Sequence, residues 1–348
     1  MRMIMKIHSV KFFSATLAMS ILICCKNDGD IEVEHLSLYN YTETSVADFF
    51  KERQDDVTTV HLDSSSLFGM GYIDQAMMWN DELFLLDWSA KKLVSYDLNG
   101  GSPLAVYGRR GRAMDEYLQI TGFDVDFDGN VWILDSQSDK LIQYDHDGHF
   151  QCKHQVPFDA LDLKCISNNL FVFAVLPVGK NPKNQDRLIV SDAEFKNSKS
   201  LLRYKNNFDV NTILSMCSFS SFDDSSFFCN DMYIDDYVIN IDFGGTVNLR
   251  YYLDFGGMAF PEEYRSNITL FQKCFGQCRC VCPPVKITDR YCIGNMFNKG
   301  LCSFFVADKI KGIMYISDDN TRYKLVGSNA DCVIFYCAES GDLLIMDF

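Results

Sequence analysis

The sequence has few basic residues, with 32 Lys and Arg against 47 Asp and Glu, and a net charge of −15. A nucleic-acid partner requires a basic surface, so this balance argues against nucleic-acid binding. The sequence also lacks the polar excess of a disordered chain, because 47% of its residues are hydrophobic. Its N-terminal apolar stretch, Phe12 to Ile23, is shorter than the ~20 residues that a membrane-spanning helix needs.

Short catalytic motifs are missing as well. We find no G-x-S-x-G elbow, no H-E-x-x-H and no Gly-rich phosphate loop. The sequence therefore predicts no cofactor and favours a non-enzymatic role. Enzymes can, however, assemble their sites from scattered residues, so the question of catalysis stays open.

The N-terminus is typical of an export signal. Arg2, Lys6 and Lys11 precede the apolar stretch, which ends in Leu22-Ile23-Cys24-Cys25. This ending resembles a bacterial lipoprotein signal, in which a cysteine is acylated and becomes the new N-terminus. Cys25 is the better candidate because Leu22 then occupies position −3. The alternative is an ordinary cleaved signal with an incidental cysteine pair.

A short acidic segment, residues 26–30, follows Cys25. It resembles the surface-export signal of Bacteroidetes lipoproteins; a plain polar tether is the alternative. Since an acidic chain repels anionic headgroups, we expect acyl chains to provide the membrane anchor. The expected location is the outer membrane, either exposed at the cell surface or facing the periplasm.

Two segments of the chain repeat one another. Residues 83–100 align with residues 131–148 without gaps, at an offset of 48. Each contains four apolar residues, a polar turn that begins with Asp, an alternating strand and a turn that ends in Gly. Upstream, residues 123–130 predict a further strand and an Asp-Gly hairpin turn. A strand–turn repeat of this length predicts a β-propeller.

Weaker copies continue to the C-terminus, and the length of the chain favours six four-stranded antiparallel blades over seven. Residues 1–24 are then the signal, 25–54 a tether and N-terminal segment, and 55–348 the propeller. Because closure removes exposed sheet edges, we expect an N-terminal strand near Val57–Leu62 to complete the last blade. Short helices are expected at Ser45–Arg53 and Pro261–Gln272.

Residues 107–118 and 123–135 carry a more specific resemblance. Tyr107-Gly-Arg-Arg-Gly-Arg-Ala-Met-Asp-Glu-Tyr-Leu118 and the repeat after it look like the six-bladed β-propeller lipoproteins of Bacteroidetes, distant relatives of NHL-repeat propellers. Family members usually show Gly-Arg-Gly-Pro-Gly-Glu-Tyr, and Ala113-Met114-Asp115 replaces part of that run here. The resemblance implies the fold but no defined activity.

The basic cluster of this run is the candidate ligand site. Arginine presents a planar fork that suits carboxylate or sulfate groups. The residues that we assign to it are Arg109, Arg110, Arg112, Glu116 and Tyr117. The alternative is an inter-blade loop with a solvated charge cluster.

Three patterns could suggest a metal, yet we predict no metal site. Asp124-x-Asp126-x-Asp128-Gly129 mimics a calcium loop but is flanked by strands. His146, His149 and His154 lie at and after a turn that does not make them converge. The cysteines from Cys274 to Cys282 lack zinc spacing; they are either buried thiols or form one or two disulfides between 274 and 292.

The sequence thus predicts a lipid-anchored envelope propeller that binds a ligand without catalysis. A glycan, a peptide or an envelope protein is the expected partner, because aromatic loops suit stacking on sugars or apolar groups. Two alternatives remain: a hydrolase or lyase with a metal near the central channel, and a structural subunit of an envelope complex.

We expect Cys25→Ser to release the protein from membranes, because it removes the acylation site. Membrane fractionation followed by detergent phase partitioning measures this, with Cys24→Ser as the matched control. Continued membrane association of the Cys25 variant would contradict lipidation.

Overall fold

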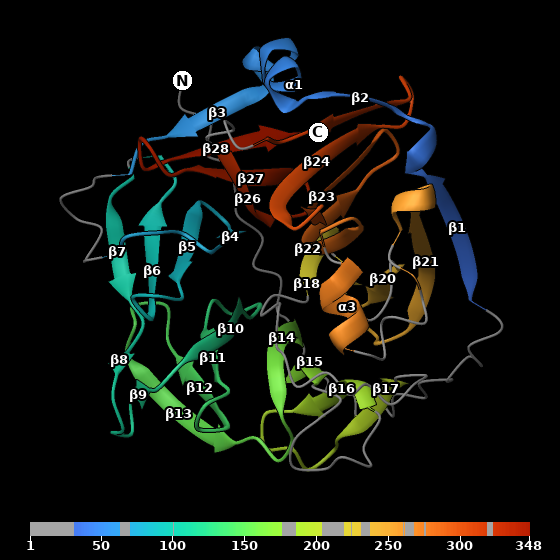
Figure 1. Ribbon diagram of the computed structural model, residues 1–348. Coiled ribbons are helices and arrows are strands. Elements are labelled where there is room, and N and C mark those ends of the chain that lie inside the picture. The colour runs from blue at the N-terminus through green and yellow to red at the C-terminus, as the bar shows by residue number, and fades with distance from the viewer. Residues whose placement is uncertain are drawn as a thin grey trace, which may run out of the picture.

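The computed structural model forms a closed ring of six β-sheets, seen along its axis in Figure 1. The structure describes residues 31–62, 70–99, 101–175, 186–203, 219–223, 225–230, 237–259, 261, 268–274, 276–318 and 323–348. The expected six-bladed propeller is confirmed. The predicted signal, residues 1–24, and Cys25 lie outside the described residues. Among the described residues, no helix is long and apolar enough to span a membrane.

Each blade runs antiparallel from an innermost strand at the axis to an outer strand at the rim. Blade 1 contains β4 (Gln75–Trp79), β5 (Glu82–Asp87), β6 (Lys92–Asp97) and β7 (Pro103–Val106). Blade 2 contains β10 (Ile120–Val125), β11 (Val131–Asp135), β12 (Lys140–Tyr144) and β13 (Phe150–Gln155). Blade 3 contains β14 (Ala160–Ser167), β15 (Leu170–Val175), β16 (Asp186–Asp192) and β17 (Lys199–Arg203).

The C-terminal half supplies the other three blades. Blade 4 contains β18 (Phe219–Asp223), β19 (Ser226–Asn230), β20 (Tyr237–Asp242) and β21 (Val247–Asp254). Blade 5 contains β22 (Arg279–Ile287), β23 (Tyr291–Asn298), β24 (Leu301–Asp308) and β25 (Ile313–Ile316). Blade 6 contains β26 (Tyr323–Ser328), β27 (Cys332–Cys337) and β28 (Asp342–Asp347), and takes its outer strand from the N-terminal segment.

The two faces of the ring differ in their loops. We call the face that carries the first-to-second and third-to-fourth strand turns the hairpin face, and the opposite one the crossover face. An aspartate stands at the third-strand end of every blade: Asp97, Asp145, Asp192, Asp242, Asp308 and Asp347. In blades 1 to 5 its carboxylate accepts a backbone N–H from the next turn, as capping aspartates do.

Neighbouring blades bury apolar side chains between them. Among the described residues there are six such clusters, one for each pair of adjacent blades. The second strands lie between two clusters, so Leu83, Phe84, Leu85 and Leu86 are all fully buried. This arrangement confirms the expectation, drawn from their continuous apolar runs, that these strands are buried on both faces.

The N-terminal segment forms a belt around the rim, which we define as residues 32–62. β1 (Glu32–Ser37) adds a fifth, parallel strand to blade 4, and β2 (Thr42–Ser45) does the same for blade 5. Blades 4 and 5 are thus five-stranded, whereas we expected four strands throughout. The alternating pattern of the blades could not predict this addition, because β1 and β2 are largely exposed.

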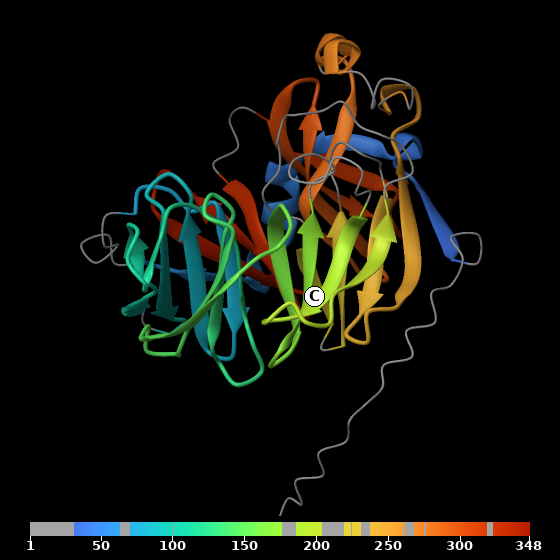
Figure 2. The same ribbon diagram turned by 90° about the horizontal axis from the view of Figure 1, so that it is seen from below.

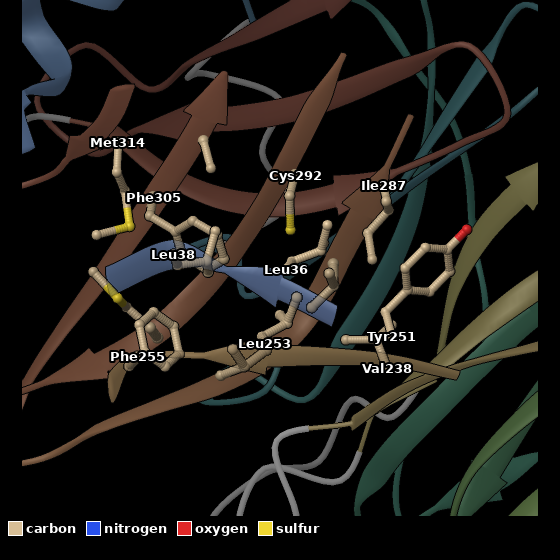
Figure 3. Packing of buried hydrophobic residues seen from close by; sticks show 14 of the residues in the cluster. Leu36, Leu38, Val238, Tyr251, Leu253, Phe255, Ile287, Cys292, Phe305 and Met314 are labelled. Carbon is tan, nitrogen blue, oxygen red and sulfur yellow. The ribbon is translucent and has the colours of Figure 1, made fainter. Parts of the chain in front are cut away.

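The belt also contributes side chains to three consecutive blade interfaces. Figure 3 shows Leu36 and Leu38, from β1 and the short helix η2 (Leu38–Asn40), packed between blades 4 and 5 against Leu253 and Phe305. Other belt residues enter the next two interfaces. Val46 and Phe49 of α1 (Val46–Glu52) pack between blades 5 and 6, and Val60 and Leu62 between blades 6 and 1.

The ring closes as expected. β3 (Val57–Val60) pairs antiparallel with β28 and becomes the outer strand of blade 6. Because β3 precedes blade 1 in the chain, blade 6 contains strands from both ends of the sequence. The chain between them therefore closes into a ring, and β3 covers the edge of β28 that would otherwise be left unpaired.

Several local expectations are also confirmed. α1 begins after Ser45, whose hydroxyl accepts a hydrogen bond from Ala47 N, and β15 pairs with β16. Of the second expected helix, Pro261–Gln272, residues 262–267 lie outside the described residues; its C-terminal part is helical in α3 (Ile268–Cys274), which projects from one side of the ring in Figure 2. The expected strand at 231–234 lies outside the described residues. The remaining short elements are η3 (Gln54–Asp56), η5 (Gly256–Met258), β8 (Arg109–Arg110) and β9 (Glu116–Tyr117).

Deletion of residues 55–63 tests closure. We expect the melting temperature to fall by about 10 °C or more, because the deletion removes β3 and the buried Val60 and Leu62. Differential scanning calorimetry measures the shift. A chain that lacks only residues 1–30 is the control and should melt like the mature parent; equal melting of the 55–63 deletion would refute closure by β3.

One ion pair fastens the belt to blade 5. The Arg279 guanidinium, only 3% exposed, donates to both oxygens of Glu43 at 2.6 and 3.0 Å and to Asn298 Oδ1 at 2.9 Å. These hydrogen bonds lower the pKa of Glu43, although partial burial opposes them. Without Glu43, a buried guanidinium would lose its charged partner, which is costly.

We expect Glu43→Gln to cost about 1 kcal/mol at pH 7, since Glu43 itself is half-exposed. The pKa is lowered, so the contribution of the pair is complete above the ordinary value of 4.5 and is lost as pH falls through the lowered pKa. Urea unfolding from pH 7 to pH 3 measures it. Glu52→Gln, which breaks the exposed pair with Lys311, is the control and should change little. Equal free energies of unfolding for the wild type and the Glu43→Gln variant at pH 7 would contradict this role.

Candidate functional site at the channel mouth

The inner strands leave only a narrow central channel. A cavity of about 40 Å³ lies among residues of all six innermost strands, including Gln75, Asp124, Asp162 and Ser328. Gly122 and Gly327 allow this close approach: a Cβ on Gly327 would lie 1.9 Å from Ala76 O, and one on Gly122 would lie 2.3 Å from Asp162 Oδ1. A space of this size holds a few waters at most.

The channel widens at the hairpin face into a cavity of about 420 Å³, which we call the mouth. Five blades contribute its lining. The lining residues are Met77, Met78, Trp79, Asn80, Val125, Asp126, Phe127, Lys164, Cys165, Phe243, Asn329, Ala330 and Asp331. Met77 and Lys164 also line the narrow channel, so the two spaces adjoin.

Aromatic rings form one side of the mouth. Phe127, in the turn between β10 and β11, is 56% exposed. Its ring contacts that of Phe243, from the β20–β21 turn, edge to face at 5.7 Å. Trp79, at the end of β4, packs against Gly129 and lies 5.8 Å from the His146 ring. A φ of +86° and the nearby indole both favour glycine at position 129.

The floor is polar. Lys164 Nζ lies 3.0 Å from Asp124 Oδ2, and both side chains are largely buried. Asp124 Oδ2 also accepts a hydrogen bond from Cys165 N at 2.6 Å. Asp126 accepts hydrogen bonds from Trp132 Nε1, from Asn130 Nδ2 and from the Asn130 backbone. Two of the three aspartates of the calcium-like pattern, Asp124 and Asp126, therefore hold strands and turns together.

Two polar contacts support the rim. His146 Nε2 lies 2.9 Å from Glu82 Oε1, beside Trp79; burial raises the pKa of Glu82, and His146 partly offsets this. On the other side, the buried Lys286 donates to Asn329 O and Ala330 O. Asn329 Oδ1 in turn accepts hydrogen bonds from the backbone of Asp331 and Cys332. The aromatic and polar parts of the rim are therefore both well fixed.

The arginine run lies elsewhere, in the connection from blade 1 to blade 2 on the crossover face. Arg109 Nε donates to Glu116 Oε1 at 2.7 Å, and Ala113 N donates to Glu116 Oε2 at 2.7 Å. These contacts lower the pKa of Glu116. Arg110 and Arg112 are exposed.

Tyr117 has a structural place within that run. Its side chain is fully buried between blades 1 and 2, and its hydroxyl donates to Lys91 O at 2.9 Å. Burial raises its pKa. The Asp135 carboxylate accepts the next two backbone N–H groups, those of Leu118 and Gln119. Of the five candidate residues, Arg109, Arg110 and Arg112 therefore present exposed side chains, whereas the phenol of Tyr117 does not reach the surface.

The remaining candidates do not gather around one point. His149 pairs with Asp145, and His154 lies against Cys152. Cys274, Cys282 and Cys292 carry free thiols, and burial raises the pKa of Cys282 and Cys292, the latter to about 12. Within the described part of the chain, no group of three or more His, Cys, Asp or Glu side chains is placed to hold a metal ion.

Sequence reasoning missed the mouth. Trp79, Phe127, Lys164 and Phe243 come from four blades and have no common spacing. A weak signal was present, since Asp126-Phe127 and Asp242-Phe243 both place a bulky ring directly after a turn aspartate. Phe127 is exposed on the face, and Phe243 is partly buried against the apolar cluster between blades 3 and 4.

Comparisons with known proteins agree with the architecture. A family model described as 6-bladed β-propeller, DUF5128, matches residues 27–269. No curated protein matches the chain significantly. A putative exported protein from Bacteroides fragilis superposes with a TM-score of 0.69 at 13% identity, over 90% of this chain and 98% of that one. A member of the duf4221 family from Bacteroides vulgatus superposes with a TM-score of 0.54 at 11% identity, over 84% of this chain and 96% of that one.

Proposed function

Because the chain belongs to the 6-bladed β-propeller family DUF5128, we propose that it is a lipid-anchored binding module of the cell envelope whose ligand occupies the channel mouth. The observation that supports this most is the mouth itself, a cavity of about 420 Å³ lined from five blades. Small-molecule sites have this size, and most combine an apolar lining with a few polar groups.

The rigidity of the mouth supports binding. Its turns are capped by aspartates and by Lys286, so ligand binding would order few additional side chains. Among the large apolar side chains of the mouth, Phe127 stands out because more than half of its surface is exposed to solvent. Covering this ring with a ligand would remove apolar surface from water, which favours association.

The envelope location rests on the N-terminus. Cys25 is the proposed acylation site, and the outer membrane, with the propeller at the cell surface or in the periplasm, is the proposed location. The similar Bacteroides fragilis protein is described as exported. Only five residues separate Cys25 from Ile31, the first described residue, so the propeller would stay close to the membrane.

The exposed arginines of the crossover face form a second proposed contact. Arg110 and Arg112 stand on a loop that Glu116 and Tyr117 hold in place. Their guanidinium groups suit a carboxylate or sulfate of the same partner or of another one. This contact lies on the face opposite the mouth, so the two can be tested separately.

Differential scanning fluorimetry against sugars, peptides, fatty acids and sulfated compounds tests the proposal. We expect at least one compound to raise the melting temperature, and Phe127→Ala to weaken that compound about tenfold by removing its stacking surface. The control is Leu104→Ala on the outer strand β7, where Leu104 is 53% exposed. The double variant Arg110→Ala, Arg112→Ala should affect only anionic compounds.

Three outcomes would contradict the mouth as a passive binding site. If every compound that binds the parent protein binds the Phe127→Ala variant with the same affinity, the ligand does not occupy the mouth. Turnover of a bound compound, detected by mass spectrometry, would indicate the hydrolase or lyase alternative. If no small molecule binds, and a co-purified envelope protein binds the Phe127→Ala variant as it binds the parent, the protein would be a structural subunit of an envelope complex.

A further inference from the structure

The charges that line the mouth are already matched within the protein. Lys164 Nζ lies 3.0 Å from Asp124 Oδ2, and the two side chains are 13% and 3% exposed. At this distance, in a site with little water, each group largely cancels the other. The positive group of the mouth is therefore engaged, and an anionic ligand would also meet the negative charge of Asp126 and Asp331.

A cationic ligand has no better prospect deep in the mouth. The Asp126 carboxylate is 1% exposed and is filled by hydrogen bonds from Trp132, Asn130 and Asp128 N. Asp331 stands at the exposed rim, where water screens its charge. A buried cation would need a carboxylate that is both desolvated and available, and neither Asp124 nor Asp126 is available.

What the mouth does offer is uncharged. Trp79, Phe127 and Phe243 present ring surfaces, and Phe127 is the most exposed of the mouth's large apolar side chains. Asn80 and Asn329 line the same space, and Asn329 Oδ1 already accepts two backbone N–H groups, so its NH₂ group is the part of this amide that a ligand can use. Ring surfaces beside amides match a molecule with apolar C–H faces and many hydroxyl groups.

We infer that the mouth binds an uncharged saccharide, with one sugar ring stacked on the Phe127 side and hydroxyl groups directed toward the Asn80 and Asn329 amides. A cavity of about 420 Å³ holds one or two sugar units. This inference rests on the proposed binding function and specifies the chemistry of its ligand. The matched charges of the floor exclude uronic and sulfated sugars from the mouth.

Native tryptophan fluorescence provides the test. The full mature protein is titrated with cellotetraose, maltotetraose and chitotetraose, and with tetragalacturonate as the acidic counterpart. We expect at least one neutral tetrasaccharide to bind and to change the emission, with tetragalacturonate at least tenfold weaker. Binding of the neutral sugar should be the same in 50 mM and 500 mM NaCl, because no ion pair forms.

Matched variants place the sugar. Trp79→Phe should remove most of the emission change, since Trp79 lines the mouth, while Trp88→Phe should retain it, because Trp88 follows β5 and does not line the mouth. Phe127→Ala should weaken binding about tenfold, and Leu104→Ala should not. Isothermal titration calorimetry measures affinity for the Trp79 variant, whose fluorescent reporter is missing.

The inference is overturned if none of the three neutral tetrasaccharides binds, if tetragalacturonate binds the Arg110→Ala, Arg112→Ala variant as tightly as they do, or if their affinity falls steeply with salt. It is also overturned if a sugar binds with no effect of Phe127→Ala. A peptide or fatty acid whose affinity depends on Phe127 would end the saccharide inference while leaving the proposed function in place. No Phe127-dependent ligand of any class would end both.

Discussion

Closure of the ring is the constraint on which the rest of this structure depends. Each blade buries both faces of its middle strands against its two neighbours, so no blade is complete alone. The chain meets this requirement by pairing β3 with β28. It then reinforces half of the ring with the belt, whose apolar side chains, from β1, η2, α1 and the segment at β3, enter three successive interfaces.

The belt connects location to function. The segment proposed to carry the acyl anchor leads directly into β1, so a pull on the membrane end would act on blades 4, 5 and 6 together. The contacts of the belt differ in strength. Glu43 meets a buried arginine, whereas Glu52 meets an exposed lysine. A buried partner makes the first contact far more costly to break.

The binding mouth follows from the same architecture. Six inner strands converge so closely that glycine is needed at two positions, which narrows the channel. The turns of the hairpin face then hold side chains around its widened end. An aspartate stands at the end of the third strand in every blade, and Phe243 directly follows the one in blade 4, Asp242. Phe127 instead follows Asp126 in the turn between β10 and β11, and the two rings meet only because the ring brings blades 2 and 4 together.

Much of the fold was predictable from local patterns. Apolar runs bounded by turn residues identified strands of all six blades, and the match between residues 83–100 and 131–148 revealed the period. The parallel strands β1 and β2 were not predictable, since their side chains are mostly exposed and only backbone pairing marks them as strands.

The candidate site was harder to predict from the sequence. The arginine run is conspicuous in sequence, but its Glu116 and Tyr117 mainly position a loop, as their hydrogen bonds show. The mouth has no linear signature at all. Lys164 and Asp124 are 40 residues apart, and whether a lysine is a free cation or a neutralised one depends on which carboxylate lies beside it.

The sequence by itself determined strands in every blade, their turns, the number of blades and the segment that closes the ring, because these follow from periodicity and turn chemistry between near neighbours. Only the tertiary structure decided which side chains share a cavity and which charges cancel. Those properties depend on distances between blades, and such distances exist only once the ring has closed.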